Sequence, residues 1–158
     1  MRAESARAGR GPTAAPSSPL TPGQSPGFLL WRVTLRWQRA MVAALRPLGL
    51  THVQFVLLAS TWWLAEVARE VVTQRRLAEH AGTDPMMTSQ VLRTLEARGL
   101  VTRAPDPEDS RARRLRVTPV GARLARRAIA VVEAADTDFF AAAPRRGTLL
   151  QILDHLSR

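Results

Sequence analysis

The sequence predicts a mainly α-helical protein that carries one small β-hairpin, and three observations support this fold class. Apolar residues recur at spacings of three and four along most of the chain after Gly27, a period typical of amphipathic helices. Two of the helical patterns, 74–81 and 85–98, are short and are separated by a turn that contains glycine, an order typical of a helix-turn-helix. Residues 100–104 and 113–117 then alternate in polarity, which predicts two strands.

The composition predicts one globular domain with a polyanionic partner. The chain has 158 residues and a formal net charge of +10, and this length suits a single domain. It contains arginine but no lysine, which we attribute to genomic base composition because the bias affects the whole chain. The positive excess is a separate observation. Arginine neutralises phosphate groups and releases their counterions, so the charge indicates a polyanion as partner.

The same composition excludes several classes of chemistry. The chain has no cysteine, which excludes disulfides, thiolate nucleophiles and cysteine-based zinc sites. Its three histidines lie far apart in sequence, so we expect no metal site. We find no nucleophile elbow, phosphate-binding glycine loop or paired apolar carboxylates, and we expect neither enzyme activity nor a cofactor. No apolar run reaches the ~18 residues of a membrane span, and the N-terminus lacks the apolar core of a signal peptide, so we expect a cytoplasmic protein that contacts no membrane.

Residues 1–26 are expected to form a disordered tail, and residues 27–158 the folded domain. The tail consists largely of Ala, Arg, Gly, Pro, Ser and Thr, and such a segment buries too little apolar surface to offset its ordering entropy. A helix is predicted from Gly27 to Leu48, ended by Pro47 and Gly49. Its repeat fits a helix that packs on the core and equally a coiled-coil seam between subunits. The apolar stripe consists of Leu30, Val33, Trp37, Ala40 or Met41, Ala44 and Leu48.

The next helix is predicted to run from His52 to about Ala68 and to be buried. Thr51 and Gln54 have the spacing of a capping box, in which each side chain satisfies a backbone donor of the other residue. The helix is apolar on most sides, as buried helices are. We interpret His52 as a hydrogen-bonded structural histidine rather than a ligand.

The two helices of the helix-turn-helix have clear start signals. Thr73 predicts the N-cap of the helix 74–81, and the glycine after it predicts its end. Asp84 followed by Pro85 predicts the start of the second helix, which ends before Gly99. Spacing places Thr88, Val91, Leu92 and Leu95 on the inner face of this second helix. Its first turn and outer face consist of Pro85, Met86, Met87, Ser89, Gln90 and Arg93.

This outer face has the chemistry of a helix that reads DNA. Glutamine bonds adenine in a bidentate manner, arginine bonds guanine or phosphate, and methionine and proline contact thymine methyl groups. The alternative is a hydrated face, but two adjacent methionines are unusual there. We therefore predict that these side chains enter a DNA groove.

The predicted hairpin forms a wing. Its loop has the sequence APDPEDSRA and carries Asp109 and Arg111. We expect Asp109 to hold Arg111 in place, while Arg111 and Arg113 reach towards a minor groove, whose negative potential attracts guanidinium groups.

These segments together resemble the MarR family of winged helix-turn-helix transcriptional regulators. The likeness covers nearly everything after Gly27, and order, spacing and wing length agree together. The segments that carry it are 50–55 (LTHVQF), 72–78 (VTQRRLA), 95–103 (LEARGLVTR), 106–111 (DPEDSR) and 117–121 (VTPVG). The family often has Thr, Ser and Arg where this chain has Met87, Ser89 and Gln90, so the operator sequence stays open.

The resemblance implies a homodimer with two lobes. Residues 50–118 form the DNA-binding lobe, and the helices in 27–49 and 119–158 form the dimerisation lobe. Asp109 matches the wing aspartate of the family and Arg111 its minor-groove arginine, and Thr73 and Arg75 are expected to contact the DNA backbone. A long helix that begins at Pro119 is predicted to pack through Leu124, Ala128, Val131, Ala135 and Phe139. A last helix after Pro144 is predicted to pack on a partner through Leu149, Ile152, Leu153 and Leu156.

The family resemblance also implies a binding site for a small aromatic or amphipathic effector. Such molecules often bind between the dimerisation helices and the DNA-binding lobe of these regulators. The aromatic residues expected to line the site are Trp31, Trp37, Phe55, Trp62 and Trp63. The alternative is that each is an ordinary core residue.

The function we predict is that of a sequence-specific regulator of transcription, a homodimeric repressor that binds a palindromic operator in double-stranded DNA and is released by an effector. Two alternatives remain open: a winged-helix module that binds only protein, and a non-specific nucleic-acid-binding protein that acts through charge. The sequence leaves open the operator, the regulated genes, the effector, the choice between repression and activation, and the role of the tail.

Overall fold

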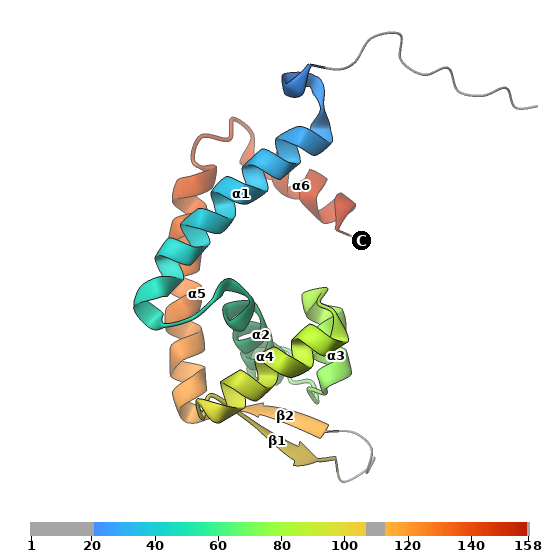
Figure 1. The fold of residues 1–158 in the computed structure, drawn as a ribbon, viewed down its shortest axis with the longest axis vertical. Helices are drawn as coiled ribbons and strands as arrows, with labels where there is room; N and C mark the ends of the chain where they lie inside the picture. The colour runs from blue at the N-terminus through green and yellow to red at the C-terminus, as the bar shows by residue number, and fades with distance from the viewer. Residues whose placement is uncertain (1–20, 107–112, 158) are drawn as a thin grey trace, which may run out of the picture. The chain divides into compact units, whose positions relative to one another are not determined.

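The computed structural model describes residues 21–106 and 113–157 and confirms the mainly helical fold with one hairpin (Figure 1). The chain divides into two compact units, residues 1–33 and residues 34–158. The helices are η1 (Pro22–Gln24), α1 (Pro26–Leu45), η2 (Arg46–Leu48), α2 (His52–Trp62), η3 (Trp63–Val67), α3 (Gln74–Ala81), α4 (Pro85–Ala97), α5 (Pro119–Phe140) and α6 (Arg146–Leu156). The strands are β1 (Val101–Pro105) and β2 (Arg113–Val117).

Residues 21–25, the described end of the predicted tail, form a local turn. Pro22–Gln24 forms a 3₁₀ turn, and the side-chain oxygen Oε1 of Gln24 accepts from Thr21 N at 3.2 Å and from Thr21 Oγ1 at 2.9 Å. These local side-chain bonds satisfy the backbone without any apolar burial, and the disordered tail stays a prediction. Residues 1–20 lie outside the described residues.

The helix boundaries follow the predicted caps. Thr51 and Gln54 form the capping box, with Gln54 Oε1 accepting from Thr51 N at 3.1 Å. Thr73 Oγ1 accepts from Arg76 N at 3.2 Å. Asp84 Oδ1 accepts from the backbone N of Met86 at 2.8 Å and of Met87 at 3.0 Å. The predicted starts of α2, α3 and α4 are therefore confirmed.

The hairpin pairs β1 with β2 antiparallel, in a register that sets Val101 opposite Val117 and Pro105 opposite Arg113. A third short segment joins this sheet, because Thr73 bridges Arg114 and Leu115 N donates to Val72 O at 2.7 Å. The sequence analysis did not predict this contact. It ties the start of α3 to the hairpin.

The core of residues 34–158 surrounds α2. The helix contacts α3, α4, α5 and β2, and Leu57 and Leu58 are fully buried, so its predicted burial is confirmed. The largest fully buried apolar side chains are Met41, Leu45, Leu57, Leu58, Leu64, Leu77, Leu92, Leu95 and Val101. Full burial of one such side chain contributes about 1.5–3 kcal/mol.

The two predicted apolar stripes are buried only in part within one chain, and the subunit seam on α1 stays a prediction. In α1 the fully buried residues are Met41 and Leu45, whereas Leu30 and Val33 are exposed. In α5 the buried residues are Gly121, Ala125, Ala128 and Val132. Leu124 and Val131 are only partly buried. Periodicity finds a helix, but small residues such as Ala125 allow close packing that a count of large apolar residues misses.

The second helix ends at Val67, close to the predicted Ala68, but its last turn is π-helical. Trp63–Val67 forms a π-helical turn, and Glu70 N donates to Leu64 O at 2.9 Å. Arg69 then adopts a left-handed backbone with φ of 59°, a conformation that costs a residue with a Cβ atom about 1 kcal/mol or more.

Within the described residues, no single helix is long and apolar enough to cross a membrane. The helices in Pro26–Leu48 and His52–Val67 meet that test of length and composition only when taken together as a bent pair.

Gly121 occupies the tightest junction of the fold. A Cβ atom on Gly121 would overlap the carbonyl oxygen of Leu100. That carbonyl already accepts from Thr118 N at 3.0 Å, and Thr118 Oγ1 donates to Gly99 O at 2.7 Å. The glycine therefore lets α5 start directly against the end of α4 and the start of β1.

Gly121→Ala is expected to lower the free energy of unfolding by about 1–3 kcal/mol or more, because the methyl group must displace backbone rather than a flexible side chain. Urea denaturation of the variant and the wild type measures the difference. Gly147→Ala is the matched control, since nothing lies within 4 Å of a Cβ atom there. Equal stability of the Gly121 variant and the wild type would contradict the junction described above.

Candidate nucleic-acid interface

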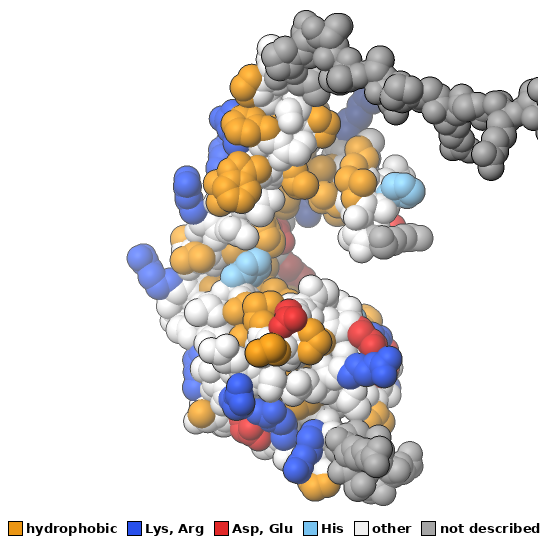
Figure 2. All heavy atoms as spheres, turned by 45° about the vertical axis from the view of Figure 1, so that its right-hand side comes forward, with side chains coloured by type: hydrophobic (Ala, Val, Ile, Leu, Met, Phe, Trp, Pro, Cys, Tyr) orange, Lys and Arg blue, Asp and Glu red, His pale blue; other side chains and the backbone are white. Residues whose placement is uncertain are grey.

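The second helix of the helix-turn-helix, α4, separates cleanly into a buried and an exposed face. Thr88, Leu92 and Leu95 are fully buried. Met86 is 81% exposed and Met87 40% exposed. Pro85, Gln90 and Arg93 are also exposed, whereas Ser89 and Val91 are partly buried. Figure 2 shows hydrophobic and arginine side chains sharing the surface of the lobe that carries these helices.

The N-terminal turn of α4 is held rigidly. Asp84 caps the helix, and Thr88 Oγ1 lies 2.8 Å from Thr83 Oγ1 and donates to Asp84 O at 2.8 Å. This buried pair of hydroxyl groups connects the turn to the helix. The exposed side chains of Met86 and Met87 therefore project from an ordered backbone.

The wing is described only at its base. Arg113 is exposed and opens β2, whereas Asp109 and Arg111 lie outside the described residues. Arg114 Nε donates to Asp106 Oδ2 at 2.8 Å, and Arg103 Nε donates to Glu96 Oε2 at 3.0 Å. These ion pairs brace the hairpin and link β1 to α4. The sequence analysis missed both, although each joins opposite charges on predicted neighbouring elements.

Thr73 and Arg75, which were expected to contact the DNA backbone, already form hydrogen bonds within the protein. The Thr73 hydroxyl accepts the cap bond from Arg76 N. The side chain of Arg75 is 90% exposed and donates to Glu79 Oε1 at 2.9 Å, which raises the pKa of Arg75. Exposed pairs of this kind contribute little stability, so Arg75 remains available to a phosphate.

Another ion pair anchors the segment between η3 and α3. Arg76 donates to Glu70 through Nε at 2.7 Å and through Nη2 at 3.1 Å. The hydrogen bonds from Arg76 hold the pKa of Glu70 below its usual value. The bidentate geometry fixes the direction of the loop that leads into α3.

The expected aromatic pocket residues fall into separate environments. Trp37 meets His52 edge to face at 4.9 Å and donates from Nε1 to Asp136 Oδ1 at 2.6 Å. Trp37 and Trp62 pack against the core. Trp31 is 60% exposed and belongs to the unit of residues 1–33.

Phe55 and Trp63 are the two expected residues that line one groove. The groove has a volume of about 290 Å³. Trp63 stacks on His80 with ring centroids 5.5 Å apart. The groove is lined by Phe55, Val56, Ala59, Ser60, Trp63, His80 and Ile129. It is therefore an open aromatic surface between α2, α3 and α5.

Comparison with known proteins identifies the family. The profile described as MarR family matches residues 50–112. The uncharacterized HTH-type transcriptional regulator YdcH of Bacillus subtilis (strain 168) is 44% identical over 135 residues, which cover 85% of this chain and 91% of the relative. The chain belongs to the MarR family of transcriptional regulators. The prediction of the family is thus confirmed, as is the prediction that the chain is not an enzyme.

Solved MarR-family structures share the fold. CouR from Rhodococcus jostii RHA1, bound to p-coumaroyl-CoA, superposes with a TM-score of 0.71 at 30% identity, covering 86% of this chain and 91% of CouR. The Mycobacterium tuberculosis MarR family protein Rv2887, in complex with DNA, gives a TM-score of 0.64 at 34% identity, covering 85% of this chain and 98% of Rv2887. Rv2887 has also been solved in complex with salicylic acid.

His52 makes the stability of this MarR-family chain depend on pH. Burial lowers the pKa of His52 below its usual 6.5, and the charge of Asp136 partly opposes that shift. The folded state thus favours neutral imidazole, so protonation favours unfolding as the pH falls below about 6.5. Glu70 affects stability only at lower pH, because its pKa lies below its usual value of 4.5.

The free energy of unfolding is expected to decrease between about pH 7.5 and about pH 5.5, and His52→Gln should flatten this decrease. Urea denaturation at several pH values measures both. His155→Gln, which replaces an exposed histidine of α6, is the control and should keep the wild-type profile. A slope in His52→Gln as steep as that of the wild type would exclude His52 as its source.

Proposed function

We propose that this MarR-family regulator is a homodimeric repressor that binds a palindromic operator and is released by a small aromatic effector. The observation that carries the proposal is that α4 has two distinct faces. Thr88, Leu92 and Leu95 are fully buried, whereas Met86, Met87, Gln90 and Arg93 are exposed. Such a helix offers hydrogen-bonding and apolar groups to base edges in a major groove.

Several features of the lobe support DNA binding. Gln90 and Arg93 suit adenine and guanine edges, and Met86 and Met87 suit thymine methyl groups. Arg113, which is exposed at the start of β2, supplies a guanidinium group for a minor groove. Asp109 and Arg111 lie outside the described residues, and their wing contact is part of the proposal. Rv2887 has been solved with DNA, and the present chain resembles it over most of its length.

Exposed apolar side chains support a homodimer. On α6, Leu150, Ile152, Leu153 and Leu156 are all exposed, and a helix of 11 residues is marginal without a packing partner. On α1, Phe28, Leu29, Leu30, Trp31 and Val33 are exposed as well. We infer that a second copy covers these surfaces, with 27–49 and 119–158 forming the dimerisation lobe. A two-fold dimer then requires a palindromic operator.

The aromatic groove supports an effector site. Phe55 and the stacked pair of Trp63 and His80 suit a planar aromatic molecule, and the imidazole can donate to a carboxylate. The relatives CouR and Rv2887 have been solved with p-coumaroyl-CoA and with salicylic acid. An effector would act by favouring a dimer whose recognition helices no longer match the groove spacing of about 34 Å.

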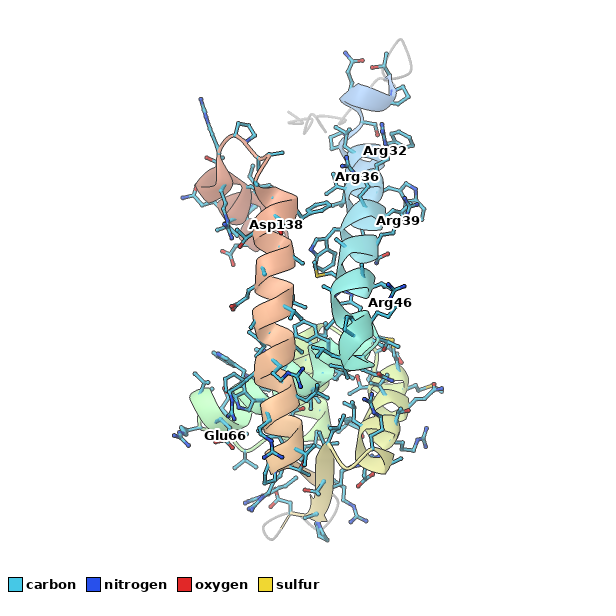
Figure 3. All side chains as sticks on the ribbon, turned by 90° about the vertical axis from the view of Figure 1, so that its left-hand side faces the viewer. Arg32, Arg36, Arg39, Arg46, Glu66 and Asp138 are labelled. Atoms are coloured by element: carbon cyan, nitrogen blue, oxygen red, sulfur yellow. The ribbon has the colours of Figure 1, made fainter. Side chains whose placement is uncertain are left out.

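A charge-only nucleic-acid binder is the second candidate. It is favoured by the net charge of +10 and by basic residues outside the winged-helix lobe. Arg39 of α1 and Arg46 of η2 project on the side away from α5 (Figure 3), and no described acidic side chain pairs with them.

A salt titration distinguishes these functions. The protein is titrated with the inverted repeat beside its coding region and with a scrambled duplex of equal length, each at several salt concentrations. A regulator prefers the repeat at every salt concentration, a charge-only binder shows no preference, and a protein-binding module binds neither duplex.

Gln90→Ala is expected to reduce discrimination at one base position by about 1–3 kcal/mol while leaving the fold intact, because the exposed amide bonds a base edge. A selection from randomised duplexes measures the base preference. Gln38→Ala, at an exposed glutamine of α1, is the matched control. An unaltered preference in the Gln90 variant would exclude Gln90 as a base contact.

Salicylate is expected to weaken binding to the operator, and Trp63→Ala should reduce this effect because the stacked aromatic surface is lost. Fluorescence anisotropy of labelled operator at increasing salicylate measures the release. Trp63→Phe keeps an aromatic face in the groove and is the matched control, which should retain most of the response. Release that is identical in wild type and the Trp63→Ala variant would assign the effector to another site.

A further inference from the structure

A second cavity lies between the π-helical turn with the loop after it and the hairpin. It has a volume of about 370 Å³. One wall is formed by η3 and the loop after it, and the other by β2. The lining residues are Ala65, Glu66, Glu70, Val71, Val72, Arg114, Leu115, Arg116 and Val117. We call this cavity the β2 cleft, and it shares no residue with the aromatic groove.

The β2 cleft has one unpaired charge of each sign. Glu70 is paired with Arg76, and Arg114 with Asp106. Glu66 and Arg116 are both exposed, and neither forms an ion pair or a side-chain hydrogen bond with any described residue. They line the same cavity without forming an ion pair with each other, and Figure 3 shows Glu66 at the outer surface of the lobe.

The backbone at this wall is unusual. It consists of the π-helical turn Trp63–Val67 followed by Arg69 in the left-handed conformation. Both features carry a conformational cost and concentrate at functional sites. Here they bring Glu66 and Glu70, together with Val71, to one cavity.

We propose that the β2 cleft binds a small zwitterion, a neutral α-amino acid with an aliphatic or aromatic side chain. Arg116 receives the carboxylate in a bidentate pair, and Glu66 receives the ammonium group. Ala65, Val71 and Val117 provide the apolar wall for the side chain. A simple anion is disfavoured by the unpaired carboxylate of Glu66, and a simple cation by the unpaired guanidinium group of Arg116.

Occupation of the β2 cleft acts on the wing. Arg116 and Arg114 lie on the same strand, and Arg114 holds Asp106 at the base of the wing at 2.8 Å. A ligand that fixes Arg116 therefore favours one arrangement of β2, and by linkage DNA that selects that arrangement alters the affinity for the ligand. This consequence rests on the proposed DNA-binding function, whereas the binding site itself does not.

Calorimetric titration of the full chain without DNA tests the site. L-valine, L-leucine and L-phenylalanine are titrated individually, alongside 4-methylpentanoate and isopentylamine, which each retain one charged group of leucine. We expect at least one amino acid to bind, and both single-charge analogues to bind about tenfold more weakly or worse, because each loses one charge-assisted contact. Absence of binding by all three amino acids, or equal binding of an analogue, overturns the proposal.

Matched variants assign the binding to the β2 cleft. Glu66→Gln and Arg116→Gln should each weaken binding about tenfold or more. Glu133→Gln and Arg123→Gln, at exposed positions of α5 outside the cleft, should bind as the wild type does. Thermal melts establish that all four variants fold. Wild-type affinity in both cleft variants overturns the assignment.

The action on the wing has a separate readout. Operator affinity is measured with and without the bound amino acid, in the wild type and in Glu66→Gln. A change in the wild type that the variant lacks supports the coupling. Unchanged operator affinity in the presence of bound ligand overturns it, and a failure of DNA binding itself would appear in the salt titration without altering the calorimetry.

Discussion

The burial of α2 is the constraint on which the rest of the structure depends. Leu57 and Leu58 of this helix are fully buried, and α2 contacts α3, α4, α5 and β2. Each of these elements covers part of the apolar surface of α2, so none can move far without exposing it to water. The exposed face of α4 and the base of the wing are therefore oriented by contacts on their inner sides.

A polar junction joins the same elements at one end. Thr118 bonds to Gly99 O and Leu100 O, and Gly121 allows α5 to approach Leu100 without a side chain between them. Arg98 donates to Gly49 O at 3.0 Å. Helix α4, the hairpin, the start of α2 and the start of α5 thus meet over a few residues.

The charged side chains of the lobe fall into two groups, those that form an ion pair and those that form none within the described residues. The paired ones, such as Arg76 with Glu70 and Arg114 with Asp106, orient loops, although exposed pairs add little to stability. Those that remain unpaired within the described residues include Arg93 and Arg113, which we propose to face DNA, and Glu66 and Arg116, which line the β2 cleft. Separate parts of the surface thus suit a polyanion and a small zwitterion.

The sequence by itself determined the local structure. Thr51 with Gln54, Thr73, and Asp84 before Pro85 predicted the helix starts correctly, since a cap is a hydrogen bond within three residues. The buried and exposed faces of α4 were also predicted from spacing, because helical spacing is a local property of the sequence. The motifs also identified the family, because they recur in a set order.

Only the tertiary structure decided which residues meet across the chain. It buried Ala125 and Val132 in place of Leu124 and Val131, formed the π-helical turn at Trp63, and paired Thr73 with Arg114. It also separated Trp37 from the groove of Phe55 and Trp63, and it assembled the β2 cleft from segments about fifty residues apart. These outcomes depend on the shape of the opposing surface, which no pattern local to one helix contains.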